Sequence, residues 1–99
     1  MTTKLRLYLI TPPVPGDPHL YCEFHIGLYD SHEEIKEAIP RVIKHLTDEM
    51  AEGINSWNLT EAELHGATFD VFSIDYDSGN RTKLYALNQQ LQQVESVSE

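Results

Sequence analysis

One segment, residues 31–53, most constrains how this chain folds, because it is the only long stretch whose apolar residues follow a helical period. The remaining regular segments alternate between apolar and polar residues, which is the pattern of half-buried strands. The helix is therefore expected to pack through one apolar stripe against a sheet. The stripe recurs at steps of three and four residues and consists of Ile35, Ala38, Ile39, Val42, Leu46 and Met50.

Local signals predict where this helix begins, bends and ends. Ser31 and Glu34 have the spacing of a capping box, and acidic residues suit the positive N-terminal end of a helix. Gly53 is a favourable residue just beyond a helix C-terminus. Pro40 has no amide N–H, so we expect it to kink the helix or to split it into two pieces. Because Pro40 points away from the apolar stripe, a kink there bends the helix around the core.

Four segments have strand character. Residues 4–11 alternate cleanly, with leucines on one side, and residues 20–29 repeat the pattern. Between them the proline-rich stretch PPVPGDP predicts a stiff, extended connection. Residues 67–88 predict a hairpin, in which Phe72 and its alternate neighbours form the apolar side, DSGN forms the turn and residues 82–87 return.

The order of these elements, β-β-α-β-β, predicts a single α+β domain over residues 1–94 with a polar tail over 95–99. One helix cannot cover both faces of a four-stranded sheet. We therefore expect two layers, with a mainly antiparallel four-stranded sheet and the long helix on the face that carries Leu5, Phe24 and Phe72.

Two shorter segments also have helical signals. Thr60 and Glu63 predict one capped turn that ends at Gly66, and we expect Trp57 just before it to plug an edge of the core. An optional short C-terminal helix is indicated by the spacing of Leu87, Leu91 and Val94.

The stretch HLYCEFH, residues 19–25, carries the side chains of a zinc site with the spacing His-x-x-Cys-x-x-His. In a strand, Cys22 points to the face opposite His19 and His25, and the two histidines lie roughly 20 Å apart. One ion requires its ligands within about 2.3 Å of itself, so we expect no metal site here. Cys22 is instead expected to be a small core residue, with His25 on the polar face.

The net charge of the chain is −9, and the acidic excess lies in its middle half. Residues 30–52 hold seven acids against three bases, and residues 53–77 hold five acids and no base. Such a field repels nucleic acid and anionic membranes and attracts basic surfaces. No segment has the length of a membrane span or the features of a secretory signal. We therefore expect a cytoplasmic protein that contacts neither nucleic acid nor membrane directly.

Catalysis has little support in the residues. The sequence contains no nucleophile elbow and no phosphate-binding loop, and a thiolate is disfavoured at Cys22 if it faces the core. Paired acids are abundant, which lowers the value of any one pair as a signal. We predict no catalytic residue, no metal and no cofactor. A small ligand-binding enzyme is kept as a third hypothesis, which requires a pocket lined by two convergent histidines.

The acidic middle of the chain is its strongest functional signal. Rows of carboxylates compete with the phosphates of DNA for the same lysine and arginine groove. Small acidic phage proteins that act against restriction, CRISPR or transcription machinery work in this way, which is an analogy of class and not a sequence match. The leading hypothesis is a non-enzymatic inhibitor that binds a basic protein surface as a DNA mimic. Its predicted partner-binding residues are Glu33, Glu34, Glu37, Asp70, Asp75 and Asp77.

A solubilising surface is the simplest alternative explanation of these acids. Glu37 and Arg41 are spaced as a helical i,i+4 pair, and so are Lys44 and Asp48. We therefore expect part of the acidic charge to be neutralised by ion pairs within the helix. The mimicry hypothesis instead requires that Asp70 stands next to the acids of the helix start.

An alternative interface is the sheet face that the helix leaves uncovered. Tyrosine and arginine, which alternation gathers on this face, are enriched at protein interfaces. The face suits an accessory subunit that docks on a partner, or the seam of a homodimer. Base stacking also uses such aromatic faces, but the net charge opposes it. The predicted residues of this face are Arg6, Tyr8, Tyr21, His25 and Tyr29, joined by Lys4 and by Lys83 or Tyr85.

Overall fold

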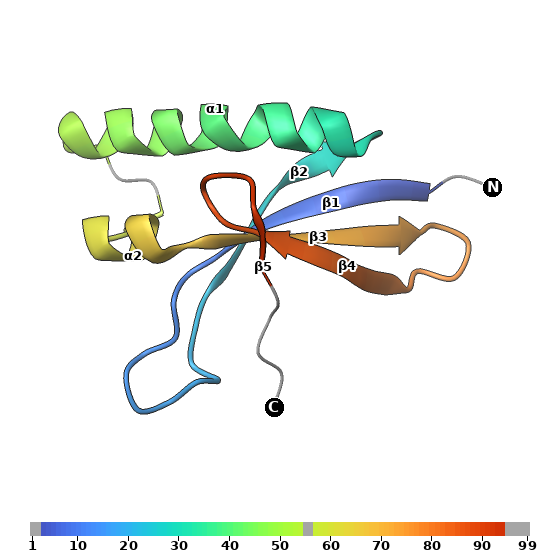
Figure 1. Cartoon of the computed structure of the whole chain (residues 1–99), viewed down its shortest axis with the longest axis horizontal. Helices are drawn as coiled ribbons and strands as arrows, with labels where there is room; N and C mark the ends of the chain where they lie inside the picture. The colour runs from blue at the N-terminus through green and yellow to red at the C-terminus, as the bar shows by residue number, and fades with distance from the viewer. Residues whose placement is uncertain (1–2, 55–56, 95–99) are drawn as a thin grey trace.

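The computed structural model describes residues 3–54 and 57–94, and the predicted polar tail lies outside them. One antiparallel sheet of five strands lies beside one long helix (Figure 1). The strand order across the sheet is β2-β1-β3-β4-β5. In chain order the elements are β1 (Thr3–Ile10), β2 (Glu23–Tyr29), α1 (His32–Ala51), α2 (Glu61–Gly66), β3 (Thr68–Asp75), β4 (Arg81–Leu87) and β5 (Gln93–Val94).

The α+β class is confirmed, but the sheet has a fifth strand where an optional helix was predicted. Residues 93–94 pair with the end of β4 as β5. The side chain of Asn88 explains the difference, because its Oδ1 accepts hydrogen bonds from the N–H groups of Gln90 and Gln92, each at 2.9 Å. Asparagine thereby gives these amides partners in a turn, and the segment does not continue as a helix.

The predicted capped turn is present as α2. Thr60 Oγ1 accepts a hydrogen bond from the N–H of Glu63 at 3.1 Å, and Glu63 Oε1 accepts one from the N–H of Thr60 at 2.9 Å. This reciprocal pair satisfies donors that a helix start otherwise leaves unpaired. Trp57 packs at the edge of the core, where its ring stacks on Phe24 with centroids 4.8 Å apart.

Local hydrogen bonds set both ends of α1. Ser31 Oγ accepts from the N–H of Glu34 at 3.2 Å, whereas Glu34 Oε1 accepts from the N–H of Asp30 at 3.1 Å, so the predicted capping box is half formed. At the other end Gly53 has a φ of 78°, and its N–H donates to the carbonyl of Met50 at 3.2 Å. A left-handed residue of this kind closes a helix by pairing its last carbonyls.

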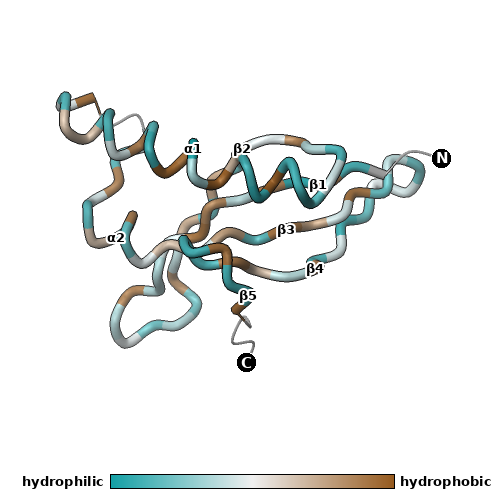
Figure 2. The backbone as a smooth tube through the Cα atoms, turned by 45° about the horizontal axis from the view of Figure 1, so that its top comes forward, coloured by the Kyte–Doolittle hydropathy of each residue, from teal (hydrophilic) through white to brown (hydrophobic). Residues whose placement is uncertain are grey.

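Pro40 does not split α1. It is exposed, and α1 is one continuous helix from His32 to Ala51 (Figure 1). Buried residues occur both before Pro40, at Ile35 and Ile39, and after it, at Leu46. Figure 2 shows the resulting alternation of apolar and polar segments along α1. The predicted single long helix is therefore confirmed and the alternative of a helix split at Pro40 is wrong, because packing of the whole stripe outweighs the hydrogen bond that proline removes.

Apolar side chains form one cluster on each face of the sheet. Both helices contribute to the larger cluster, and neither contributes to the smaller one. We name the face of the smaller cluster the uncovered sheet face. The larger cluster contains Leu5, Leu7, Leu9, Ile35, Ile39, Leu46, Leu59, Leu64, Ala67, Phe69, Val71 and Leu87. The smaller cluster contains Tyr8, Phe72 and Ile74, with Ile10 packed against it.

The predicted helix face combined Leu5, Phe24 and Phe72, and the assignment of Phe72 is wrong. Phe72 pairs with Arg6 in the β1–β3 register and belongs to the smaller cluster, whereas Val71 is part of the larger one. β3 is the central strand, and four consecutive residues of it are buried. When both faces of a strand are buried, an apolar pattern does not reveal which face meets the helix.

Bulges reverse two further assignments that simple alternation makes. β2 contains an irregularity at Ile26, so Tyr29 pairs with Leu5 and packs on the helix side. β4 contains one at Leu84, so Tyr85 also packs against the larger cluster. Alternation places Tyr29 on the uncovered sheet face, with Tyr85 or Lys83. The placements of the two tyrosines are wrong because one extra residue shifts the side-chain phase, whereas Lys83 pairs with Phe72 and lies on that face.

Residues 11–22 form a loop that projects from the sheet between β1 and β2 (Figure 1). At its base the N–H of Thr11 donates to the carbonyl of Cys22 at 3.0 Å. At its tip the N–H of Asp17 donates to the carbonyl of Val14 at 2.9 Å, so the connection contains a tight turn in addition to the predicted extended chain. Cys22 is exposed, and its predicted core position is wrong because the strand begins only after it. Prolines cannot donate to a strand ladder, which delays the start of pairing.

Candidate protein-interaction surfaces

Five of the six predicted partner-binding acids lie at one end of the molecule, where α1 begins and the β3–β4 hairpin turns (Figure 1). Nδ1 of His32 and the hydroxyl of Tyr85 are hydrogen-bonded at 2.5 Å, which ties the start of α1 to the sheet. In the β1–β3 register Thr3 pairs with Asp75, the last residue of β3. The next residue, Lys4, forms an ion pair with Asp30, just before α1. We name the five predicted acids at this end of the molecule the acidic end. They are Glu33, Glu34, Glu37, Asp75 and Asp77.

Most carboxylates of the acidic end have no internal counterion. The expected pair of Glu37 with Arg41 is absent from the described part of the chain, although Lys44 Nζ lies 2.8 Å from Asp48 Oδ2 as predicted. Within residues 3–54 and 57–94, four exposed acids of this end form no ion pair. No direct ion pair with a described residue therefore neutralises them, although Glu34 lies close enough to Lys4 to help raise the pKa of that ammonium. They are Glu33, Glu34, Glu37 and Asp77.

Asp75 has a structural part in the acidic end. It is half-buried, and its carboxylate accepts hydrogen bonds from the N–H of Asp77 at 3.0 Å and from the hydroxyl of Ser78 at 3.1 Å. Gly79 completes the turn with a φ of 79°, and its N–H donates to the Asp75 carbonyl at 2.7 Å. The predicted DSGN hairpin turn is confirmed, and Asp75 stabilises it.

Asp70 does not join the acidic end. It lies on the uncovered sheet face, is only 8% exposed, and its Oδ2 is 3.2 Å from Lys83 Nζ. Burial raises the pKa of Asp70, and the neighbouring Lys83 ammonium opposes that rise. The prediction that Asp70 stands beside the acids of the helix start is wrong, because the phase of β3 turns it to the other face.

The uncovered sheet face combines cations with aromatic rings. The rings of Tyr8 and Phe72 meet edge to face with centroids 5.4 Å apart, and these residues are 8% and 9% exposed. The guanidinium carbon of Arg81 lies 4.5 Å from the centroid of Phe72 and 5.3 Å from that of Tyr8. These cation–π contacts cover the rings, so the rings are not available to stack on a nucleic-acid base.

Arg6 is the least satisfied polar group of this face. Its Nε is buried with no hydrogen-bond partner among residues 3–54 and 57–94, and its Nη1 donates to the Tyr8 hydroxyl only at 3.4 Å. Neither Arg6 nor Arg81 forms an ion pair within the residues that the structure places. A buried donor without a partner costs about 1–3 kcal/mol. An anionic group on this face would supply the missing acceptor.

The predicted residues of the uncovered sheet face are divided among three places. Arg6, Tyr8 and His25 lie on it, with the rings of Tyr8 and His25 5.6 Å apart. Tyr29 faces the helix, where burial raises the pKa of its hydroxyl. Tyr21 is exposed in the projecting loop.

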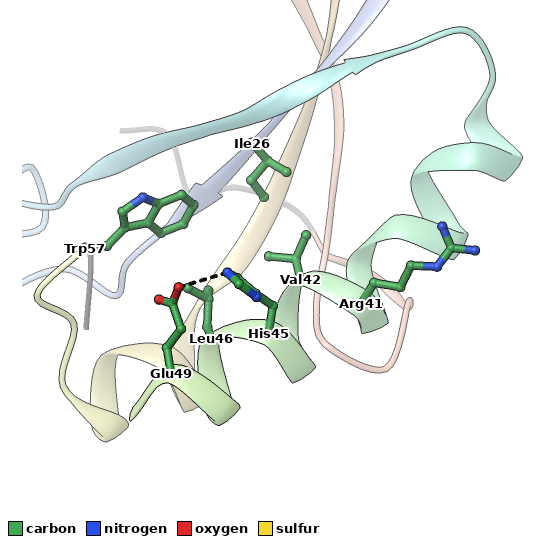
Figure 3. Close-up of a pocket in the computed structure, with 7 residues that line it drawn as sticks. All are labelled: Ile26, Arg41, Val42, His45, Leu46, Glu49 and Trp57. Atoms are coloured by element: carbon green, nitrogen blue, oxygen red, sulfur yellow. Dashed lines mark ion pairs between the residues drawn. The ribbon is translucent and has the colours of Figure 1, made fainter. Parts of the chain in front are cut away.

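A pocket of about 300 Å³ between α1 and β2 is a third candidate site (Figure 3). It is lined by one histidine, His45, whose Nε2 lies 2.9 Å from Glu49 Oε2. The enzyme hypothesis requires two convergent histidines, which this pocket does not supply. Over residues 3–54 and 57–94, no three His, Cys, Asp or Glu side chains gather in a way that would hold a metal ion.

Sequence reasoning missed two cations of these sites, Arg81 and Arg41. Arg81 follows directly after the hairpin turn, and the β3–β4 register sets it opposite Ile74 on the uncovered sheet face. Counting across the turn would have found it once the phase of β3 was known. Arg41 gave no signal, because its spacing from Glu37 assigned it to a surface ion pair.

The fold places this chain among small α+β proteins with one antiparallel sheet and a single long helix. No protein-family model matches the chain, and neither a curated protein nor a solved structure matches it at a significant level. Among the described residues, no helix combines the length and the hydropathy needed to cross a lipid bilayer. The function is therefore inferred from the chemistry of the surfaces themselves.

Proposed function

We propose that this chain is a non-enzymatic, acidic protein-binding module that inhibits its partner. Its acidic end occupies a basic, nucleic-acid-binding surface of that partner by charge mimicry. The observation that carries the proposal is the exposure, at one end of the fold, of four carboxylates that form no ion pair with any residue that the structure describes. With a net charge of −9, the whole molecule also steers toward a basic surface.

The placement of the carboxylates favours charge mimicry over a role in solubility alone. Glu33, Glu34 and Glu37 lie on the first two turns of α1, which fixes their relative positions. Residues four apart on a helix are separated by about 6 Å along its axis. Phosphates of one DNA strand follow one another at about 3.4 Å along the duplex axis. The acids at the start of α1 therefore present negative charge to a groove of lysines and arginines at a density similar to that of DNA.

The test compares two four-fold variants that change the net charge equally. In each, four exposed acids are replaced by their amides, which keep their shape and most hydrogen-bonding capacity. The first variant neutralises the acidic end through Glu33→Gln, Glu34→Gln, Glu37→Gln and Asp77→Asn. The control neutralises exposed acids elsewhere through Asp17→Asn, Glu23→Gln, Glu52→Gln and Glu61→Gln.

Wild type and both variants serve as baits in a host lysate, and the retained protein is identified and then purified. We expect wild type and the control to retain the same basic protein, and the acidic-end variant to lose it. Binding of the purified partner should weaken steeply from low to high salt. Equal retention by the acidic-end variant, or an affinity that holds steady across the salt series, would overturn the proposal.

A second candidate function is docking through the uncovered sheet face, and it is favoured by Arg6 and Arg81, which form no ion pair among the residues that the structure describes. A symmetric homodimer through this face would bring the arginines of two copies together, so the arrangement favours an accessory subunit whose partner supplies a carboxylate. A bait carrying Arg6→Gln and Arg81→Gln distinguishes the two candidates. Loss of the partner from this bait, with retention by the acidic-end variant, supports docking through the sheet and refutes charge mimicry.

A further inference from the structure

The pocket between α1 and β2 has a built apolar wall. Ile26 comes from β2, Val42 and Leu46 come from α1, and Trp57 closes one end (Figure 3). Trp57 stacks on Phe24 with an interplanar angle of 6°. This contact holds the indole in place, so Trp57 forms a fixed wall of the pocket. The volume of about 300 Å³ is at the lower limit for sites that take small molecules.

Three polar side chains complete the lining, and they differ in how well they are satisfied. His45 and Glu49 are paired with each other at 2.9 Å. Arg41 forms no ion pair with a carboxylate in the part of the chain that the structure describes. Its positive charge opposes the larger effect of burial, which raises the pKa of the nearby Tyr29 hydroxyl. Arg41 therefore places an exposed positive charge, without an ion pair among the described residues, at one end of a mostly apolar pocket that also contains the Glu49 carboxylate.

The two ends of the pocket differ in chemistry. Figure 3 shows Trp57 and Arg41 at opposite ends of the lining side chains, with Ile26, Val42 and Leu46 between them. A guanidinium binds a carboxylate through two parallel hydrogen bonds, and an apolar wall favours an aromatic or aliphatic body. A ligand that satisfies both ends has one anionic group and an apolar tail. Because the protein is itself strongly acidic, a single negative charge is favoured over a multiply charged ligand.

We propose that this pocket binds a small apolar monocarboxylate, with its carboxylate at Arg41 and its apolar body between Val42 and Trp57. This binding is separate from the acidic end and does not depend on the proposed function. No residue of the acidic end lines the pocket.

The chain contains a single tryptophan, so the emission of Trp57 reports directly on this pocket. The probe is 4-phenylbutyrate, and its neutral isostere 4-phenylbutyramide tests the need for the charge. We expect saturable changes in Trp57 emission, with the carboxylate binding roughly tenfold or more tightly than the amide. Backbone amide NMR shifts should be largest at Ile26, Val42 and Leu46.

Two charge-matched variants of α1 test the role of Arg41. Arg41→Gln should abolish the preference for the carboxylate while leaving the affinity for the amide unchanged. Lys44→Gln removes an exposed charge one turn of helix away and should keep the preference. Each of three results would overturn the proposal. These are the absence of saturable binding, equal loss of preference in both variants, and NMR shifts centred on Arg6 and Arg81.

Discussion

Replacing Pro40 with alanine is expected to stabilise the protein by about 2 kcal/mol. Eight helical residues precede Pro40 in α1, so it is an interior residue and not part of a first turn, where proline is tolerated. Proline in a helix interior costs about 3 kcal/mol relative to alanine. Proline also restricts the unfolded chain, and losing that restriction offsets about 0.4–1 kcal/mol. Pro40 is exposed, so alanine removes no buried contact.

Thermal and urea unfolding followed by circular dichroism measure this change. For a domain of this size, about 2 kcal/mol corresponds to a rise in Tm of roughly 8–16 °C. The dependence of the unfolding free energy on urea should be unchanged, because the same surface is exposed on unfolding. Lys36→Ala is the control, since it exchanges one good helix former for another on the exposed side of α1 and should change stability by less than about 0.5 kcal/mol. If Pro40→Ala is no more stable than Lys36→Ala, then proline does not destabilise α1 at this position, and the prediction is wrong.

Three further predictions concern the sheet. Phe69 is fully buried in the central strand, so Phe69→Ala should reduce the free energy of unfolding by about 3–5 kcal/mol in a urea titration, and a loss below about 1 kcal/mol would contradict this packing. Arg81→Ala removes a cation over two rings and should destabilise by about 1–2 kcal/mol in the same assay, whereas an unchanged midpoint would mean that Arg81 does not cover them. Burial raises the pKa of Asp70, so the folded protein binds a proton there more readily than the unfolded chain. The unfolding free energy of wild type should therefore fall, relative to Asp70→Asn, as pH rises from the unfolded-state pKa through the raised folded-state pKa. Parallel stability curves of the two proteins between about pH 3 and pH 7 would contradict this sign.

Local sequence signals predicted both helices, the first two strands and the β3–β4 hairpin with most of their ends, but not β5. The start of α1 at Ser31, its stop at Gly53, the capped turn after Thr60 and the hairpin turn at Gly79 all follow from side-chain and backbone hydrogen bonds within a few residues. Such interactions depend only on residue identity and spacing, so they are legible in a single sequence. The same locality made the acids of the helix start predictable as exposed.

The face that each side chain occupies, and the charges that are paired, depend on contacts between elements that are distant in the sequence. Phe72 and Asp70 lie on the uncovered sheet face because β3 is central and buried on both sides, and Tyr29 faces the helix because β2 contains a bulge. Both effects depend on neighbouring strands. Because side chains in a strand alternate with a period of two residues, one extra residue turns every later side chain to the opposite face. The pairing of Asp70 with Lys83, and the lack of an ion pair at Arg41 within residues 3–54 and 57–94, likewise depend on what the fold brings within a few ångströms.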